Sequence, residues 1–160
     1  MDLAATKWKK NKRLANMEAY MIGVLMISHG KMVEGIKNSV ELIMGKQDQV
    51  DCLGLNEGND FNTFKESVYQ KIIHLNTGSG VIVLVDLFGA SPYNATAMNV
   101  ERLKESHCNI KVVTGINLPM VLETITYRQQ KITLDELYKH ALITGKDGIK
   151  EMFEEINKER

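Results

Sequence analysis

Two kinds of hydrophobic pattern alternate along this chain. Residues 21–27 and 81–85 are apolar at nearly every position, which is typical of parallel strands that helices cover on both faces. Residues 31–44 and 61–75 instead repeat their apolar side chains with a helical period of about 3.6 residues. This alternation of strands and helices predicts an α/β protein.

Two further strands are expected at 49–55 and 110–114, so strands and helices alternate throughout. Right-handed crossovers join consecutive parallel strands in nearly all sheets. The sequence therefore predicts an open, doubly wound, mainly parallel sheet with helices on both faces, and we take its core strand order to be 2-1-3-4.

Polar residues indicate where helices begin and end. Asp60 is suited to cap the helix at 61–75. Thr133 and Glu136 form a capping box, which opens a helix that we expect to end at Gly145. A further helix is expected at 117–128.

We divide the chain into three parts. Residues 1–20 are a leader with five basic residues against two acidic ones and no clean period, which we interpret as an added tag or a disordered extension. Residues 21–150 form the single expected domain, and residues 151–160 form a C-terminal tail. Apolar side chains at helical spacing within 147–159 predict a helix there.

The composition excludes several classes of protein. The 20 Lys and Arg residues balance the 20 Asp and Glu residues, so the basic surplus that nucleic-acid binding needs is missing. Cys52 and Cys108 are far apart and outside any CxxC spacing, which argues against a disulfide framework and fits a reducing cytoplasm. No apolar run approaches the roughly 20 residues of a membrane span, so neither membrane insertion nor export is expected.

A histidine and an aspartate follow two strands that the predicted order makes neighbours. His29 comes after the strand at 21–27, and Asp86 follows the strand at 81–85. Ligands of such sheets bind beyond the carboxyl ends of the strands, where the strand order reverses, so we expect these side chains to meet. A neutral imidazole is a nucleophile near neutral pH, and a carboxylate that accepts its other N–H would fix the tautomer and stabilise the charged ring. The pair is therefore a candidate for phosphoryl transfer.

The turn after Asp86 is suited to hold the oxygens of a phosphoryl group. Gly89 lets the backbone approach closely, and the free N–H groups at the start of a helix favour an anion. Ser91 followed by Pro92 predicts an N-cap and a helix that runs to about Glu105. The Ser91 hydroxyl would supply one more hydrogen bond.

Competing site patterns are missing or poorly placed. No GxGxxG follows the first strand, no cluster of metal ligands stands out, and no cofactor is expected. A hydrolase triad of Ser28, His29 and Asp86 is disfavoured because consecutive residues that leave a strand tend to point to opposite faces. The other histidines have no carboxylate opposite them in the predicted topology and are interpreted as surface or structural residues: His74, His107 and His140.

Three motifs at the ends of predicted strands resemble those of mannose-family IIA proteins of sugar phosphotransferase systems. They are Ser28-His29-Gly30, Val85-Asp-Leu-Phe-Gly-Ala-Ser-Pro-Tyr-Asn94 and Gly115-Ile-Asn-Leu-Pro-Met120, and the resemblance covers roughly residues 21–150. It implies a phosphotransferase with a phosphohistidine intermediate, in which His29 accepts a phosphoryl group from HPr and passes it to a IIB component. It also implies a homodimer that exchanges an edge strand near the C-terminus, which conflicts with a helical tail.

The resemblance also implies the roles of individual residues. Asp86 would orient His29. Four residues would bind the phosphoryl group: Ser28, Gly89, Ala90 and Ser91. Ala90 stands where the family usually has glycine, so the backbone there would be strained if it required a positive φ.

Two alternatives remain open. The phosphocarrier subunit of dihydroxyacetone kinases has a histidine after the first strand of the same fold, although the stretch 86–94 favours the sugar-transport branch. The other alternative is a regulatory module that phosphorylation of His29 controls, with no onward transfer. The transported sugar cannot be predicted, because a IIA component does not contact it.

Overall fold

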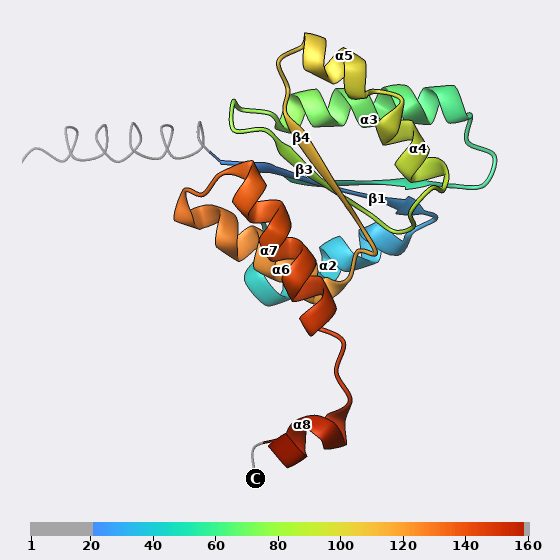
Figure 1. The fold of residues 1–160 in the computed structure, drawn as a ribbon. Helices are drawn as coiled ribbons and strands as arrows, with labels where there is room; N and C mark the ends of the chain where they lie inside the picture. The colour runs from blue at the N-terminus through green and yellow to red at the C-terminus, as the bar shows by residue number, and fades with distance from the viewer. Residues whose placement is uncertain (1–20, 159–160) are drawn as a thin grey trace, which may run out of the picture.

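The computed structural model describes residues 21–158 (Figure 1). Its centre is a four-stranded, all-parallel sheet with the order β2-β1-β3-β4, which confirms the predicted fold class. The strands are β1 (Gly23–His29), β2 (Val50–Leu55), β3 (Val81–Val85) and β4 (Ile110–Thr114). β1 extends beyond the predicted end at residue 27 because Ser28 and His29 continue to pair with β2.

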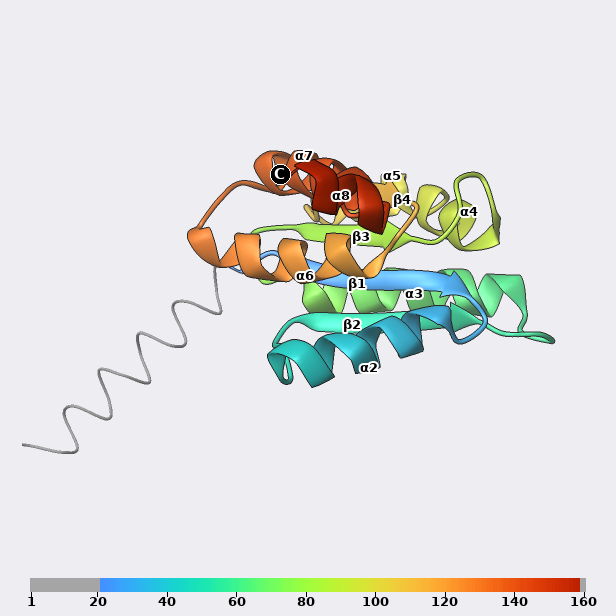
Figure 2. The same ribbon diagram turned by 90° about the horizontal axis from the view of Figure 1, so that it is seen from below.

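Helices cover both faces of the sheet, as predicted. One layer contains α2 (Met32–Met44), α6 (Leu118–Tyr127) and α7 (Leu134–Asp147), and Figure 2 looks onto this layer from below. The other layer, above the sheet in Figure 1, contains α3 (Phe61–Leu75), α4 (Ser91–Ala97) and α5 (Val100–Glu105). A 3₁₀ turn, η1 (Arg128–Gln130), follows α6, and α8 (Met152–Lys158) lies near the C-terminus.

β3 shows why a central strand of this sheet is apolar throughout. Val81, Val83 and Val85 pack into the core beneath α3, α4 and α5. Ile82 and Leu84 point the other way, into the core formed with α2, α6 and α7. All five side chains are completely buried, and each such burial contributes roughly 1.5–3 kcal/mol of transfer free energy.

Two predicted helix starts are confirmed by the side chains that cap them. The Asp60 carboxylate accepts the backbone N–H of Thr63 at 2.7 Å. Thr133 and Glu136 form the expected capping box in front of α7. Both arrangements satisfy N–H groups that have no partner inside the helix, and both depend only on residues close in sequence.

The helix predicted at 91–105 is in fact two helices, α4 and α5. Asn99 lies at the break, and its buried amide donates to the carbonyl oxygens of Ala95 at 2.9 Å and Lys65 at 2.8 Å. Lys65 belongs to α3, so the break depends on a contact between residues distant in sequence. Helical periodicity does not reveal such a contact.

The predicted end of the last domain helix at Gly145 is wrong. α7 continues to Asp147, and its C-cap is Gly148. Gly145 is buried, and a Cβ atom at this position would collide with the side chain of Met120 in α6. Gly145 therefore lies inside α7 where it faces α6, and only the flexible end of Met120 would have to shift to admit a Cβ atom there.

The predicted helix in the tail is confirmed over Met152–Lys158. None of the α8 residues is buried, and the helix lies apart from both helix layers in Figure 1. The leader predicted at 1–20 and the final residues 159–160 lie outside the described part of the chain. The boundaries of the three parts stay predictions.

A buried arginine joins elements at the amino-terminal end of the sheet. Arg128 is only 4 % exposed, and its guanidinium donates to the carbonyl oxygens of Ile22 at 2.8 Å, Gln49 at 3.3 Å and Asp48 at 2.6 Å. Burial lowers the pKa of Arg128 to about 10, so the group stays charged at neutral pH. The arginine thus holds η1 against the segment that enters β1 and the loop that precedes β2.

Candidate active site

His29 and Asp86 meet at the carboxyl-terminal end of the sheet. His29 is the last residue of β1, Asp86 directly follows β3, and the two strands are paired. Nδ1 of His29 lies 2.7 Å from Oδ2 of Asp86, and the backbone N–H of His29 donates to the same oxygen at 2.8 Å. The other carboxylate oxygen, Oδ1, accepts the N–H of Leu87 at 2.8 Å. The structure thus brings these two predicted site residues into direct contact.

The surroundings of Asp86 favour its ionised form. Burial by itself would raise the pKa of Asp86, but hydrogen bonds from the backbone and ring of His29, together with the Leu87 N–H, outweigh it. The pKa of this carboxyl group therefore lies below its ordinary value. Asp86 is a carboxylate throughout the neutral range.

The hydrogen bond to Asp86 determines which nitrogen of His29 can react. An ionised carboxylate only accepts hydrogen bonds, so Nδ1 of the neutral ring carries the proton. Nε2 is then left with its lone pair. The His29 side chain is 46 % exposed, compared with 12 % for Asp86, so the nucleophilic side of the ring can reach a partner in solution.

Backbone hydrogen bonds to neighbouring strands hold both residues. The N–H of Asp86 donates to the Ile27 carbonyl of β1 at 3.2 Å, and the Asp86 carbonyl accepts the N–H of Gly115 after β4 at 3.2 Å. The N–H of Gly30 donates to the Leu55 carbonyl of β2 at 2.8 Å. All four strands therefore contribute to the position of the pair.

The turn between Asp86 and α4 has a positive φ at one residue only. Gly89 has φ 75°, a conformation that side chains with a Cβ rarely adopt. Ala90 has φ −85° and ψ 176°, which is extended backbone, so alanine is unstrained here and the strain expected from a positive φ does not arise. The predicted N-cap at Ser91 is wrong: Ala90 is the N-cap, and Ser91 is the exposed first residue of α4.

Ser28 occupies a different environment from the other predicted phosphoryl-binding residues. It is completely buried, and its hydroxyl accepts the backbone N–H of Val33 in α2 at 3.2 Å. His29, the next residue, is exposed. The alternation of side chains along β1 thus separates Ser28 from the reactive face of the imidazole.

One prediction about the other histidines is wrong. Nε2 of His140 in α7 lies 2.9 Å from a carboxylate oxygen of Glu123 in α6, and the His140 ring stacks on Tyr127 with ring centroids 3.7 Å apart. The pair forms between two helices, so the order of the strand ends gives no sign of it. His74 and His107 are exposed.

Asn94 is a residue of the site to which sequence reasoning gave no role. Its side-chain amide donates to the carbonyl oxygen of Gly89 at 3.0 Å. The asparagine stands in the motif that follows Asp86, but nothing in the sequence shows where its side chain points.

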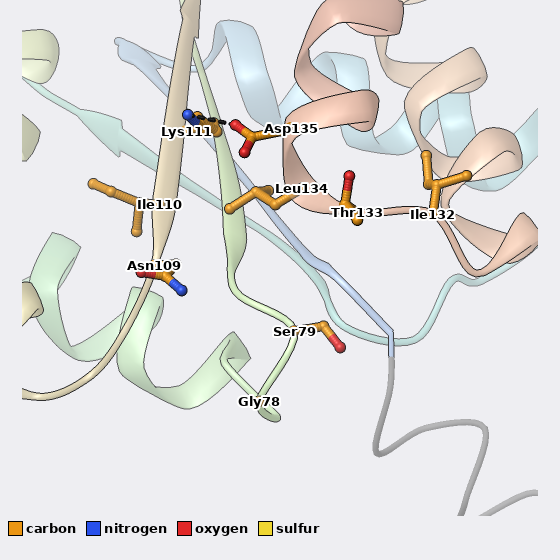
Figure 3. Close-up of a pocket in the computed structure, with 9 residues that line it drawn as sticks. All are labelled: Gly78, Ser79, Asn109, Ile110, Lys111, Ile132, Thr133, Leu134 and Asp135. Atoms are coloured by element: carbon orange, nitrogen blue, oxygen red, sulfur yellow. Dashed lines mark ion pairs between the residues drawn. The ribbon is translucent and has the colours of Figure 1, made fainter.

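A cavity of about 530 Å³ lies at the opposite end of the sheet, where β3 and β4 begin (Figure 3). It is lined by Gly78, Ser79, Asn109, Ile110, Lys111, Ile132, Thr133, Leu134 and Asp135. Lys111 and Asp135 form an ion pair across it at 2.6 Å. None of the predicted site residues lines this cavity.

Residues 21–158 contain no group of three or more metal-ligating side chains suited to hold an ion. Within the same range, no helix is long and apolar enough to cross a membrane.

Comparisons with known proteins relate this geometry to a family. The family described as "PTS system fructose IIA component" matches residues 23–142. The mannose-specific EIIAB component of Escherichia coli (strain K12) is 31% identical over 129 residues, which are 81% of this chain and 39% of that protein. The fructose-specific EIIA component of Bacillus subtilis (strain 168) is 28% identical over 117 residues, or 73% of this chain and 77% of the relative.

Solved structures agree with these matches. The crystal structure of the phosphotransferase system component EIIA from Streptococcus agalactiae superposes with a TM-score of 0.73 at 30% identity, covering 82% of this chain and 97% of the other. The family match covers both His29 and Asp86, and the sheet order agrees with the fold of this solved structure. The chain belongs to the mannose-type EIIA components of the sugar phosphotransferase system, a family of phosphotransferases.

Proposed function

We propose that this chain is a cytoplasmic phosphocarrier whose His29 accepts a phosphoryl group from phospho-HPr and passes it to a IIB component. The observation that carries the proposal is the 2.7 Å contact between Nδ1 of His29 and Oδ2 of Asp86. This contact commits one ring nitrogen to the carboxylate and leaves Nε2 for the reaction. The family match supports the same role, since the matched region contains both residues.

The two side chains divide the chemistry between them. The Nε2 lone pair forms a bond to phosphorus while the phosphorus–nitrogen bond of the phosphohistidine donor breaks and its electron pair returns to the donor ring. The His29 ring becomes positively charged, and the Asp86 carboxylate compensates that charge while the proton stays on Nδ1. The IIB component then removes the phosphoryl group, which restores the neutral ring.

Residues of the turn that follows Asp86 would bind the phosphoryl oxygens. The backbone N–H groups of Gly89 and Ala90 and the Ser91 hydroxyl are the proposed donors, because charge-assisted hydrogen bonds to an anion are strong. Ser28, which faces the interior, would act indirectly by holding the start of α2 through Val33.

Exposed apolar side chains near the pair suit a protein partner. Leu87 is 59 % exposed and Phe88 is 72 % exposed, and both follow Asp86 directly. Apolar and aromatic side chains of this kind are enriched in protein interfaces, whereas a small sugar would need an enclosing pocket.

We also propose that the chain forms a homodimer. Sedimentation of the full chain would test this proposal.

Phosphorylation of the full chain tests the proposal. Incubation with phosphoenolpyruvate, enzyme I and HPr is expected to add one phosphoryl group, measured by intact mass spectrometry, and His29→Ala is expected to abolish this uptake. His140→Ala is the matched control, since His140 also pairs with a carboxylate but lies on a different surface, and it should retain uptake. Unchanged uptake by His29→Ala would disprove the proposal.

Transfer to an acceptor separates the remaining alternatives. The phosphorylated protein is offered purified IIB components, dihydroxyacetone kinase subunits or no acceptor. Loss of the phosphoryl group to a IIB component alone is the expected result. Transfer to the kinase subunits, or retention in the presence of every acceptor, would favour the kinase or the regulatory reading.

A further inference from the structure

We infer that Asn94 is a positioning residue for phosphoryl transfer: its side-chain amide fixes the peptide that joins Gly89 to Ala90, so that the Ala90 N–H faces the phosphoryl group on His29. The inference rests on the proposed function and deepens it. It assigns a role to a side chain that need not touch the reacting atoms.

Asn94 holds two consecutive carbonyl groups of the turn. Its side-chain Nδ2 donates to the Gly89 oxygen at 3.0 Å, and its backbone N–H donates to the Ala90 oxygen at 2.9 Å. The backbone bond is the ordinary one of the first helical turn, which any residue but proline would form. The side-chain bond depends on an amide at this position.

Fixing the Gly89 carbonyl also fixes the Ala90 N–H. The peptide bond is planar and trans, so its C=O and N–H point in opposite directions. Since the carbonyl is held toward Asn94 in α4, the N–H is held away from α4. One hydrogen bond therefore sets the direction of a donor proposed to bind the phosphoryl group.

Gly89 makes such a restraint necessary. With φ 75° and no Cβ atom, glycine leaves the neighbouring peptide free to rotate. Rotation would exchange the positions of the Gly89 carbonyl and the Ala90 N–H, and a carbonyl oxygen repels phosphoryl oxygens where an N–H group attracts them. Asn94 thus selects the orientation of the turn that favours an anion.

The turn lies close to the reacting ring along the chain. The N–H of Leu87 donates to the Asp86 carboxylate, and that carboxylate holds His29. Only Leu87 and Phe88 separate Asp86 from Gly89. The orientation of the peptide is therefore coupled to the site through a short segment anchored at its first residue.

Substitution of Asn94 should affect transfer more than folding. The side chain is exposed, so Asn94→Ala creates no cavity in the core. We expect the kcat for phosphoryl uptake from phospho-HPr to fall about 10-fold, less than the loss on deleting a donor outright, while the KM for HPr stays within about 2-fold. Asn94→Asp should lose more, because a carboxylate cannot donate to the Gly89 oxygen and repels the phosphoryl group.

The matched control is Asn38→Ala, which makes the same change at an exposed position of α2. Rates are divided by the folded fraction of each variant, which is obtained from its free energy of unfolding in urea. In parallel, ¹H–¹⁵N spectra follow the Ala90 amide, whose proton should shift downfield on phosphorylation of the parent and of Asn38→Ala but not of Asn94→Ala.

Two results would overturn the inference: uptake by Asn94→Ala at the parent rate, or a reduced rate with the Ala90 shift of the parent intact. Failure of the proposed function would be seen elsewhere, in a parent protein that takes up no phosphoryl group or in uptake that survives His29→Ala.

Discussion

The two ends of the sheet hold an arginine and a histidine in opposite ways. At the amino-terminal end, Arg128 is 4 % exposed and its guanidinium is bonded to three backbone carbonyls. At the carboxyl-terminal end, His29 is 46 % exposed and is held through one ring nitrogen, with the other nitrogen left free. The structural charge is enclosed and donates from both terminal nitrogens of its guanidinium, although its Nε is buried without a partner. The reactive group is anchored at one atom and accessible at another.

The difference follows from how much hydration each group loses on folding. A buried guanidinium has to recover its lost hydration through hydrogen bonds, so its contacts stabilise the fold and leave little for chemistry. A half-exposed imidazole keeps water on its free side, and its anchor determines direction rather than stability. Substitutions around Arg128 should therefore lower the free energy of unfolding, and substitutions around His29 should slow phosphoryl transfer.

The largest effect is expected at the carboxyl-terminal end of the sheet, where His29 and Asp86 lie. Asp86→Asn replaces the acceptor with an amide that cannot compensate the charged ring, so uptake from phospho-HPr should slow by between about 10² and 10⁴-fold. The fold should persist, because the side chain keeps its shape. Rapid-quench kinetics measures the rate and circular dichroism the fold. Transfer at the parent rate would show that Asp86 is only a turn residue.

The corresponding change at the amino-terminal end of the sheet is Arg128→Met. It removes the hydrogen bonds that the guanidinium donates to the carbonyls of Ile22 and Asp48, which should cost about 3 kcal/mol of unfolding free energy in urea titrations. The transfer rate per folded molecule should not change. Lys104→Met breaks an exposed ion pair with Glu101 and is the control, with an expected cost below about 1 kcal/mol. An equal cost for both variants would contradict the structural role of Arg128.

A smaller effect tests the backbone of the turn. Gly89→Ala should cost about 1 kcal/mol because φ is 75°, and it should slow transfer by displacing the turn. Ala90→Gly should cost about 0.5 kcal/mol through the entropy of the unfolded chain, and it should not raise the rate, since Ala90 is unstrained. A faster Ala90→Gly variant would show that the alanine side chain restrains the turn during transfer.

The smallest effect concerns pH. Because the folded pKa of Asp86 is lowered, its ionisation adds stability above the ordinary pKa of about 4, and this contribution is lost as the pH falls through the folded value. The difference in unfolding free energy between the parent and Asp86→Asn should therefore be constant near neutrality and shrink below about pH 4. A difference independent of pH down to pH 2 would contradict the lowered pKa.

Much of the fold could be predicted because its signals are local or periodic. The apolar run of β3 indicated a strand buried on both faces, and Thr133 with Glu136 indicated the start of α7. The meeting of His29 and Asp86 followed from strand order, since residues at the ends of neighbouring parallel strands must lie together. The continuation of α7 past Gly145 could not be predicted, because a glycine inside a helix and a glycine that ends a helix look alike in sequence.

The sequence by itself determined the alternation of strands and helices and placed His29 and Asp86 directly after two apolar strands, because periodicity is a property of the chain. The strand order that brings the two residues together was assumed from the fold class, and the structure has that order. Tertiary structure alone decided the break at Asn99 and the contact of His140 with Glu123. It also decided the hydrogen bonds from Arg128 to backbone carbonyls and the direction of the Asn94 side chain. These features depend on where a side chain points after packing, and packing energies arise between residues that the sequence does not show as neighbours.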